Sequence, residues 1–171
     1  METWDAIRTR RDVRKYEDRP IPAEDLDRIL EAGRRAPSSR NRQDWDFVLV
    51  TDRERLRELA QVWRGADHVA GAAAAIALVA PDEEEVWRRE AVQFDLGQAA
   101  MSMMLAAADL GIGSGHAYVD DQELARKLLG HPEDRFCALM IPLGYPADRP
   151  LRPLRSPNRR PFDDVVHRDR F

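Results

Sequence analysis

Apolar residues recur at helical spacing over residues 23–35, and the helix they predict turns one side toward a core. Its inward positions are Leu26, Ile29, Leu30 and Gly33. Pro37 follows, and the helix must end before it because the proline ring blocks the helical conformation and its nitrogen carries no proton. The pattern therefore predicts an amphipathic helix that leads into a polar loop.

Two further stretches are apolar on more than one face. Residues 72–80 contain no polar side chain and stop at Pro81, which favours a central strand over a short helix. Residues 84–109 predict a long helix whose later half is apolar nearly all round. Such a helix is buried on most sides, either in the core or against a partner subunit.

The other predicted elements are shorter. Residues 2–8 predict a helix with Trp4 and Ile7 turned inward. Residues 45–50 are rich in β-branched and aromatic side chains, as in a buried strand. A further strand is predicted over residues 136–142, followed by a proline-rich extended arm and a last short helix. These two final segments cover residues 146–157 and residues 162–167.

Capping residues mark where helices begin and end. Thr51 and Glu54 form a capping-box pattern ahead of one helix, and Asp120 and Glu123 form one ahead of another. A glycine is expected in the left-handed conformation after a helix, which places helix ends at Gly111 and Gly130. Since no repeat or low-complexity linker interrupts this order, residues 1–171 predict a single α+β domain with a sheet between helices.

Composition excludes several classes of protein. Hydrophobic residues make up 43% and charged residues 34% of the 171 positions, which disfavours a disordered or fibrous chain. Cys137 lies in an apolar run and resembles a small hydrophobe more than a nucleophile. Neither a signal peptide nor a stretch long enough to span a bilayer is recognised, so the expected location is the cytoplasm, without a membrane partner.

Positive charge is concentrated at the two ends of a chain whose net charge is −4. The early cations are Arg8, Arg10, Arg11, Arg14, Lys15 and Arg19, and the late ones are Arg152, Arg155, Arg159 and Arg160. If residues 10–14 are extended, Arg10, Asp12 and Arg14 share a side, and two arginines at that spacing can grip a phosphate dianion. A solvated basic stretch or a nucleic-acid arm is the alternative, and the acidity of the whole chain disfavours nucleic acid.

The loop over residues 37–43 offers two hydroxyls and two amides at the start of a strand. Asn and Gln side chains each donate and accept hydrogen bonds, which suits the alternating carbonyl and NH groups of a flavin edge. On these residues alone, an ordinary connection between a helix and a strand explains the loop as well. The four histidines show no metal-ligand spacing, and no metal site is expected.

Five motifs, taken in order, resemble the nitroreductase family of FMN enzymes. They are Arg10-Arg11-x-Val13-Arg14, Ala36-Pro-Ser-Ser-x-Asn-x-Gln43-x-Trp45, Leu110-Gly-Ile-Gly-Ser114, Ile141-Pro-Leu-Gly-Tyr-Pro146 and Arg159-Arg-Pro-Phe-Asp-Asp-Val-Val-His167. The resemblance implies a layered α+β fold, an α/β/α sandwich with a mostly antiparallel sheet. It also implies an intertwined homodimer with FMN at the interface.

The resemblance also implies roles for individual residues. The FMN phosphate and ribityl chain would be held by Arg10, Arg11 and Arg14, together with Arg159 or Arg160. The flavin would be reached from the partner subunit by Pro37, Ser38, Ser39 and Asn41, with Gln43 supporting the loop. The isoalloxazine ring would be lined, chiefly through backbone groups, by Gly113, Ser114, Gly115 and His116.

The implied activity is ping-pong hydride transfer from NAD(P)H to a small oxidised acceptor such as a nitroaromatic or a quinone. No side-chain acid or base is obligatory, because the cofactor carries the chemistry. A flavin-binding protein without turnover, or a flavin-consuming enzyme of the same fold, is the alternative. Two positions depart from the family pattern: Asp12 stands where serine is common, and Asp44 stands where proline is usual. Asp12 would place a carboxylate beside the phosphate unless an arginine neutralises it.

Overall fold

A fully apolar strand lies at the centre of the computed structural model, which describes residues 1–154 and 158–171. Strand β2 (Ala74–Pro81) pairs antiparallel with β1 (Asp46–Val50) on one side and with β5 (Arg135–Gly144) on the other. Two short strands also pair antiparallel with β5, namely β3 (Gly113–Ser114) and β4 (Ala117–Tyr118). The predicted antiparallel sheet, with residues 72–80 at its centre, is confirmed.

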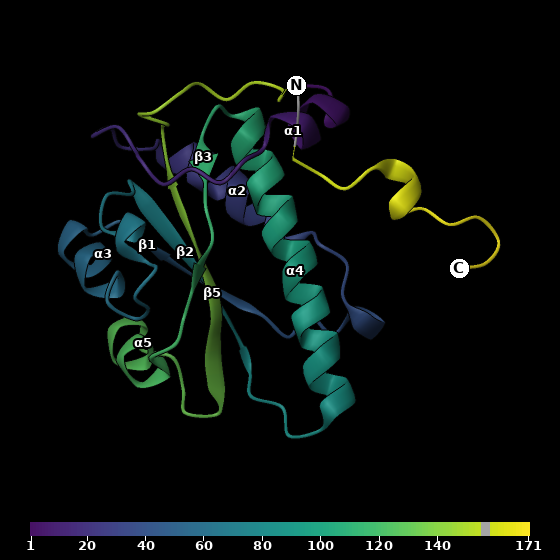
Figure 1. Cartoon of the computed structure of the whole chain (residues 1–171). Coiled ribbons are helices and arrows are strands. Elements are labelled where there is room, and N and C mark those ends of the chain that lie inside the picture. The colour runs from purple at the N-terminus through teal and green to yellow at the C-terminus, as the bar shows by residue number, and fades with distance from the viewer. Residues whose placement is uncertain (155–157) are drawn as a thin grey trace.

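Helices cover both faces of this sheet (Figure 1). On one face α2 (Ala23–Arg34) packs against the long helix α4 (Val86–Asp109), and α1 (Thr3–Thr9) also contacts α4. On the other face lie α3 (Arg53–Leu59) and α5 (Gln122–Leu129), which contact each other. The three-layer α+β architecture expected from the sequence is confirmed.

The two faces of β2 explain why its sequence does not alternate between polar and apolar residues. Ile76 and Leu78 belong to the core beneath α2 and α4, whereas Ala77 and Val79 belong to the core beneath α3 and α5. All four side chains are buried. Because successive side chains of a strand point to opposite faces, a strand between two cores must be apolar throughout.

Helix ends follow the sequence closely, but the N-terminal caps lie one residue later than predicted. The side chain of Asp52, not Thr51, accepts from the Arg55 amide at the start of α3. At α5, Asp121 takes the role predicted for Asp120. An aspartate carboxylate satisfies the amide three residues ahead, so the two aspartates next to the helices act as caps. The glycine ends are confirmed, since Gly111 and Gly130 both have φ of 74°.

Three predictions about burial are wrong. Trp4 and Ile7 are exposed, because α1 turns Ala6 and Thr9 toward the protein instead. The strand β1 is only half-buried, since it lies at the edge of the sheet. Cys137, which was predicted to resemble a small hydrophobe, is fully buried, and removal from water raises the pKa of its thiol to about 12.

Beyond β5 the chain runs back past α1 and then leaves the body of the molecule (Figure 1). The prediction of a helix over residues 162–167 is wrong, because only the 3-10 turn Phe162–Asp164 forms there. A segment this short needs packing to hold a helix, and its apolar side chains are exposed. Residues 155–157 of the predicted arm lie outside the described residues. Within the described ranges, no helix has both the length and the apolar character needed to cross a bilayer.

Candidate functional site

The segment after α1 lies directly against β3 and holds the first group of predicted site residues. The amide of Val13 donates to the Ser114 carbonyl at 2.9 Å, and Asp12 forms an isolated parallel bridge with Ser114. A Cβ added at Gly115 would come within 2.8 Å of the Val13 carbonyl oxygen. Glycine is therefore required at Gly115 so that the basic segment can approach this backbone.

Arg10, Asp12 and His116 form a cluster at this junction. The Arg10 guanidinium donates to the Asp12 carboxylate at 2.9 Å and lies 3.2 Å from Nδ1 of His116. It also contacts the sulfur of Met104 on α4 at 3.0 Å. The structure thus answers the question raised by the carboxylate at Asp12, because Arg10 neutralises it.

Charge in this cluster is biased toward cations. The hydrogen bond with His116, and then the charges of Arg10 and Arg14, lower the pKa of the Asp12 carboxyl below its usual value. Arg14 is exposed beside this pair. Two guanidinium groups and one carboxylate leave a net positive charge, which suits an anionic ligand.

The backbone groups of residues 113–116 are largely engaged within the chain. The Gly115 amide donates to the Pro142 carbonyl at 3.1 Å, and the His116 carbonyl accepts from Nε2 of His68 at 3.1 Å. Gly113, Ser114 and Gly115 are buried, whereas the His116 side chain is 45% exposed. Of the four residues predicted to line a flavin, His116 therefore offers the accessible side chain.

His68 supports the backbone of the site, and no pattern in the sequence predicted it as a site residue. Its ring is 9% exposed and holds the His116 carbonyl. Burial, and next the charge of Arg14, lower the pKa of His68. The folded protein therefore disfavours the protonated ring.

We expect this burial to make the free energy of unfolding depend on pH. Between the folded-state pKa and the unfolded value of about 6.5, the unfolded chain binds more protons, so stability falls as pH is lowered through this window. His68→Gln should flatten that slope in urea unfolding measured from pH 7.5 to pH 5 at fixed protein concentration. His167→Gln, which changes an exposed histidine, serves as the control. An unchanged slope in His68→Gln would contradict the assignment.

Arg11 lies apart from Arg10 and Arg14. Its guanidinium donates to the Asp148 carboxylate at 2.7 Å and to the Arg149 carbonyl at 2.7 Å. Alternation along an extended segment turns neighbouring side chains to opposite sides. The structure therefore brings Arg10, Asp12, Arg14 and His116 together and directs Arg11 elsewhere.

The predicted loop over residues 37–43 is held against the middle of α4. Asp95, which is 7% exposed, accepts from the Ser39 amide at 2.8 Å and from its hydroxyl at 3.2 Å. The Gln43 amide donates to the Ser38 hydroxyl, and the Gln43 side chain donates to the Asn41 carbonyl. Asp95 was missed, although it is the single charged residue between positions 91 and 108. A lone carboxylate in an apolar helix was the available signal.

The backbone of this loop is strained. Arg40, Asn41 and Gln43 have φ of 55°, 57° and 55°, in the left-handed region that residues other than glycine rarely adopt. Three such residues in one loop persist only where surrounding contacts fix them, and such strain is concentrated at functional sites. Asp95 supplies one of those contacts.

The two groups of predicted residues lie at different positions along α4. The loop is anchored at Asp95, whereas the Arg10 cluster meets the helix at Met104. Nine residues of helix separate these positions, a rise of about 14 Å. The late arginines join neither group among the described residues: Arg159 bonds the Asn158 carbonyl, and Arg160 bonds the Asp164 carbonyl.

Comparison with known proteins gives a consistent result. The model of the nitroreductase family matches residues 7–89 and 61–145. A protein of Archaeoglobus fulgidus, provisionally named an NADH dehydrogenase/NAD(P)H nitroreductase, is 34% identical, and the alignment covers 96% of each chain.

Two solved structures share the fold. The FMN-dependent nitroreductase of Clostridium difficile superposes with a TM-score of 0.85 at 27% identity, covering 98% of this chain and 99% of that one. The NADPH:FMN oxidoreductase of Vibrio harveyi, solved with NAD+, gives a TM-score of 0.85 at 28% identity, covering 99% of this chain and 77% of that one. The predicted family is therefore confirmed, and the chain belongs to the nitroreductase family.

Proposed function

We propose that this protein binds FMN and transfers hydride from NADH or NADPH to a small oxidised acceptor, such as a nitroaromatic or a quinone. The family and the names of its relatives support an FMN-dependent oxidoreductase that uses a reduced nicotinamide. The observation that carries the proposal in this chain is the cationic cluster of Arg10 and Arg14 against the glycine-containing segment at β3. The acceptor rests on the family resemblance.

The residues of the cluster fit the phosphate of FMN. Among the described residues, the buried Nε of Arg10 has no hydrogen-bond partner, and Arg14 is exposed. A phosphate monoester carries close to two negative charges at neutral pH and offers strong acceptor oxygens. It would complete the hydrogen bonds of these arginines, and the Arg10–Asp12 pair would hold the guanidinium in place.

We extend the proposal to a homodimer because one face of α4 lacks a cover. Trp87, Phe94 and Met101 recur every seven residues on this helix and are 50%, 69% and 44% exposed. Beside them a hollow is lined by Pro37, Gly97 and Leu105, among others. Large apolar side chains next to a hollow are typical of a protein interface, and a symmetric pairing would cover both copies of the face.

A dimer would also complete the cofactor site. The 37–43 loop lies on the side of α4 that carries Phe94, since Pro37 and Phe94 line the same hollow. Across a two-fold interface this loop would meet the partner's cofactor. The strained loop backbone, which Asp95 holds in place, supports a binding role. The C-terminal arm, with its exposed Phe162 and Val165, would reach the partner in the same way and bring Arg159 or Arg160 to a phosphate.

When bound, FMN supplies the two-electron chemistry by accepting a hydride and passing it on. The chain's own residues would bind the phosphate end and orient the ring. Donor and acceptor would occupy the same site in turn, which gives ping-pong kinetics. The family resemblance places residues 113–116 beside the ring. Among these four residues, His116 has the one exposed titratable side chain.

We expect His116→Ala to slow flavin reduction by NAD(P)H no more than about tenfold, equivalent to about 1.4 kcal/mol. Hydride transfer needs no proton from the protein, so His116 would orient Arg10 and Asp12 without acting as an acid. Stopped-flow bleaching of flavin absorbance measures this half-reaction separately from the acceptor step. A loss of a hundredfold or more, with FMN still bound, would make His116 a catalytic acid.

The proposed function itself is tested by a visible spectrum. The purified protein should be yellow, should bleach on addition of NADH or NADPH without oxygen, and should regain its colour when a quinone or a nitroaromatic is added. A flavin that bleaches but returns with neither acceptor would overturn the proposed acceptor class. A flavin that never bleaches would indicate a binding protein without turnover.

A further inference from the structure

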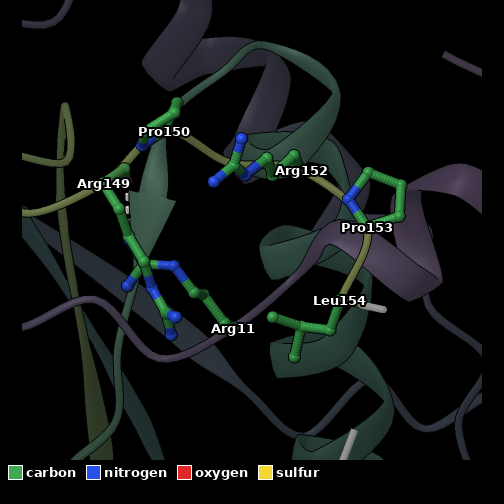
Figure 2. Close-up of a pocket in the computed structure, with 6 residues that line it drawn as sticks. All are labelled: Arg11, Arg149, Pro150, Arg152, Pro153 and Leu154. Carbon is green, nitrogen blue, oxygen red and sulfur yellow. Dashed lines mark hydrogen bonds between the residues drawn. The ribbon is translucent and has the colours of Figure 1, made fainter. Parts of the chain in front are cut away.

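A cationic pocket, separate from the Arg10 cluster, lies on the other side of the basic segment over residues 10–14. It is a cavity of about 410 Å³ lined by Arg11, Arg149, Pro150, Arg152, Pro153 and Leu154. Figure 2 shows these residues as a ring, with the Arg11 side chain reaching from the Leu154 side toward Arg149. We call this cavity the Arg11 pocket.

The pocket is held in place by contacts with the N-terminal region. Arg11 donates to the Arg149 carbonyl at 2.7 Å, and the Leu154 amide donates to the Arg8 carbonyl at 3.4 Å. The Asp148 carboxylate accepts from both the Arg11 guanidinium and the Arg149 amide. Hydrogen bonds at Arg149 and at Leu154 therefore hold both ends of this lining segment against the N-terminal region.

Charge in the pocket is unbalanced. Three guanidinium groups line it, and the carboxylate that bonds Arg11 is that of Asp148. The Arg11 side chain is 8% exposed, and its buried Nε has no partner among the described residues. Arg149 and Arg152 are exposed, and an anion bound between them and the buried Arg11 would offset the two excess positive charges. A phosphate monoester dianion matches that charge and the forked geometry of arginine.

We infer that the Arg11 pocket binds a phosphate monoester, and that the 2′-phosphate of NADPH is its source. This inference rests on the proposed function, which supplies the nicotinamide. Arg11 points away from the Arg10 cluster, so the pocket is separate from the group assigned to the FMN phosphate. The 2′-phosphate is the group that distinguishes NADPH from NADH, and three arginines that bind it would make NADPH the preferred donor.

The test replaces both arm arginines in the variant Arg149→Gln/Arg152→Gln and measures steady-state kinetics with each donor. We expect KM for NADPH to rise at least tenfold, the scale of one lost charge-assisted hydrogen bond, and KM for NADH to change less than twofold. Arg57→Gln, which removes an exposed cation on α3, controls for the loss of overall positive charge. It should leave both donors unaffected.

Binding of 2′,5′-ADP, followed by calorimetry on the FMN-loaded protein, gives a readout independent of turnover. We expect binding to the wild type and at least tenfold weaker binding to the double variant, whereas adenosine, which carries no phosphate, should not distinguish them. If the double variant instead loses affinity for FMN but not for riboflavin, the phosphate in the pocket belongs to the cofactor. If 2′,5′-ADP, FMN and both donors bind the variant as they bind the wild type, the pocket is no anion site.

The two proposals can fail separately. A wild-type protein that binds 2′,5′-ADP through these arginines, but whose flavin neither NADH nor NADPH bleaches, would support the Arg11 pocket and contradict the hydride-transfer function. A protein that turns over NADH and NADPH equally, before and after the double substitution, would support the function and contradict the pocket.

Discussion

Phe94→Glu is expected to convert the proposed FMN-loaded dimer into a monomer that binds FMN poorly. Phe94 is 69% exposed at the centre of the apolar stripe on α4, and a symmetric dimer would bury two copies of it. A buried, unpaired carboxylate at the centre of an interface costs several kcal/mol, so the dimer dissociation constant should rise at least a hundredfold, about 2.7 kcal/mol. Sedimentation velocity at two protein concentrations, recorded at flavin and protein wavelengths, measures both effects.

Phe94→Leu is the matched control, because it keeps an apolar side chain of similar reach and should remain a yellow dimer. Circular dichroism should show that Phe94→Glu retains its helices, since the side chain is outside the core. FMN affinity should fall together with dimerisation, because the cofactor would then lack the proposed contacts with the partner's loop over residues 37–43. A Phe94→Glu protein that sediments as an FMN-loaded dimer would show that this face of α4 is not the interface.

Arg14→Ala is expected to weaken FMN binding by about 1.5 to 3 kcal/mol, the range of a hydrogen bond to a charged group. Arg14 is exposed next to Asp12 and His68, and its charge acts on both. Among the described residues it is therefore the cation of the cluster that is available to a phosphate, whereas Arg10 already bonds Asp12. Titration of the apoprotein, followed by flavin fluorescence, gives the dissociation constants.

Riboflavin provides the internal control for Arg14→Ala, because it has the ring and the ribityl chain but no phosphate. It should bind the wild type and the variant with the same affinity, and Arg57→Ala should affect neither ligand. Equal losses for FMN and riboflavin would mean that Arg14 shapes the site as a whole and does not hold the phosphate.

Much of the fold is determined by local patterns. The spacing of Leu26 and Ile29 predicts α2, and the uninterrupted apolar run over residues 72–80 predicts a strand between two cores. The glycines at Gly111 and Gly130 end their helices in the left-handed conformation, as predicted. These features depend on a few neighbouring residues, on backbone geometry and on the period of the side chains, so a single sequence carries them.

The ordered series of motifs also predicted the family, which the comparisons confirm. The sequence could not predict which partner each arginine contacts. Arg10 and Arg11 are adjacent and chemically identical, yet one bonds Asp12 and the other bonds Asp148, which is 137 positions away. His68 and Asp95 became visible as site residues only through contacts with His116 and Ser39.

The sequence by itself determined the order of helices and strands, the central place of β2 and the family, because each follows from patterns that neighbouring residues share. Tertiary structure alone decided that Trp4 and Ile7 face outward, that Arg10 neutralises Asp12, and that Arg11 turns to a separate pocket closed by the arm. Those outcomes depend on which distant segments meet. The free energy of a partly buried charge is set by the partners that tertiary packing brings to it and not by its neighbours in sequence.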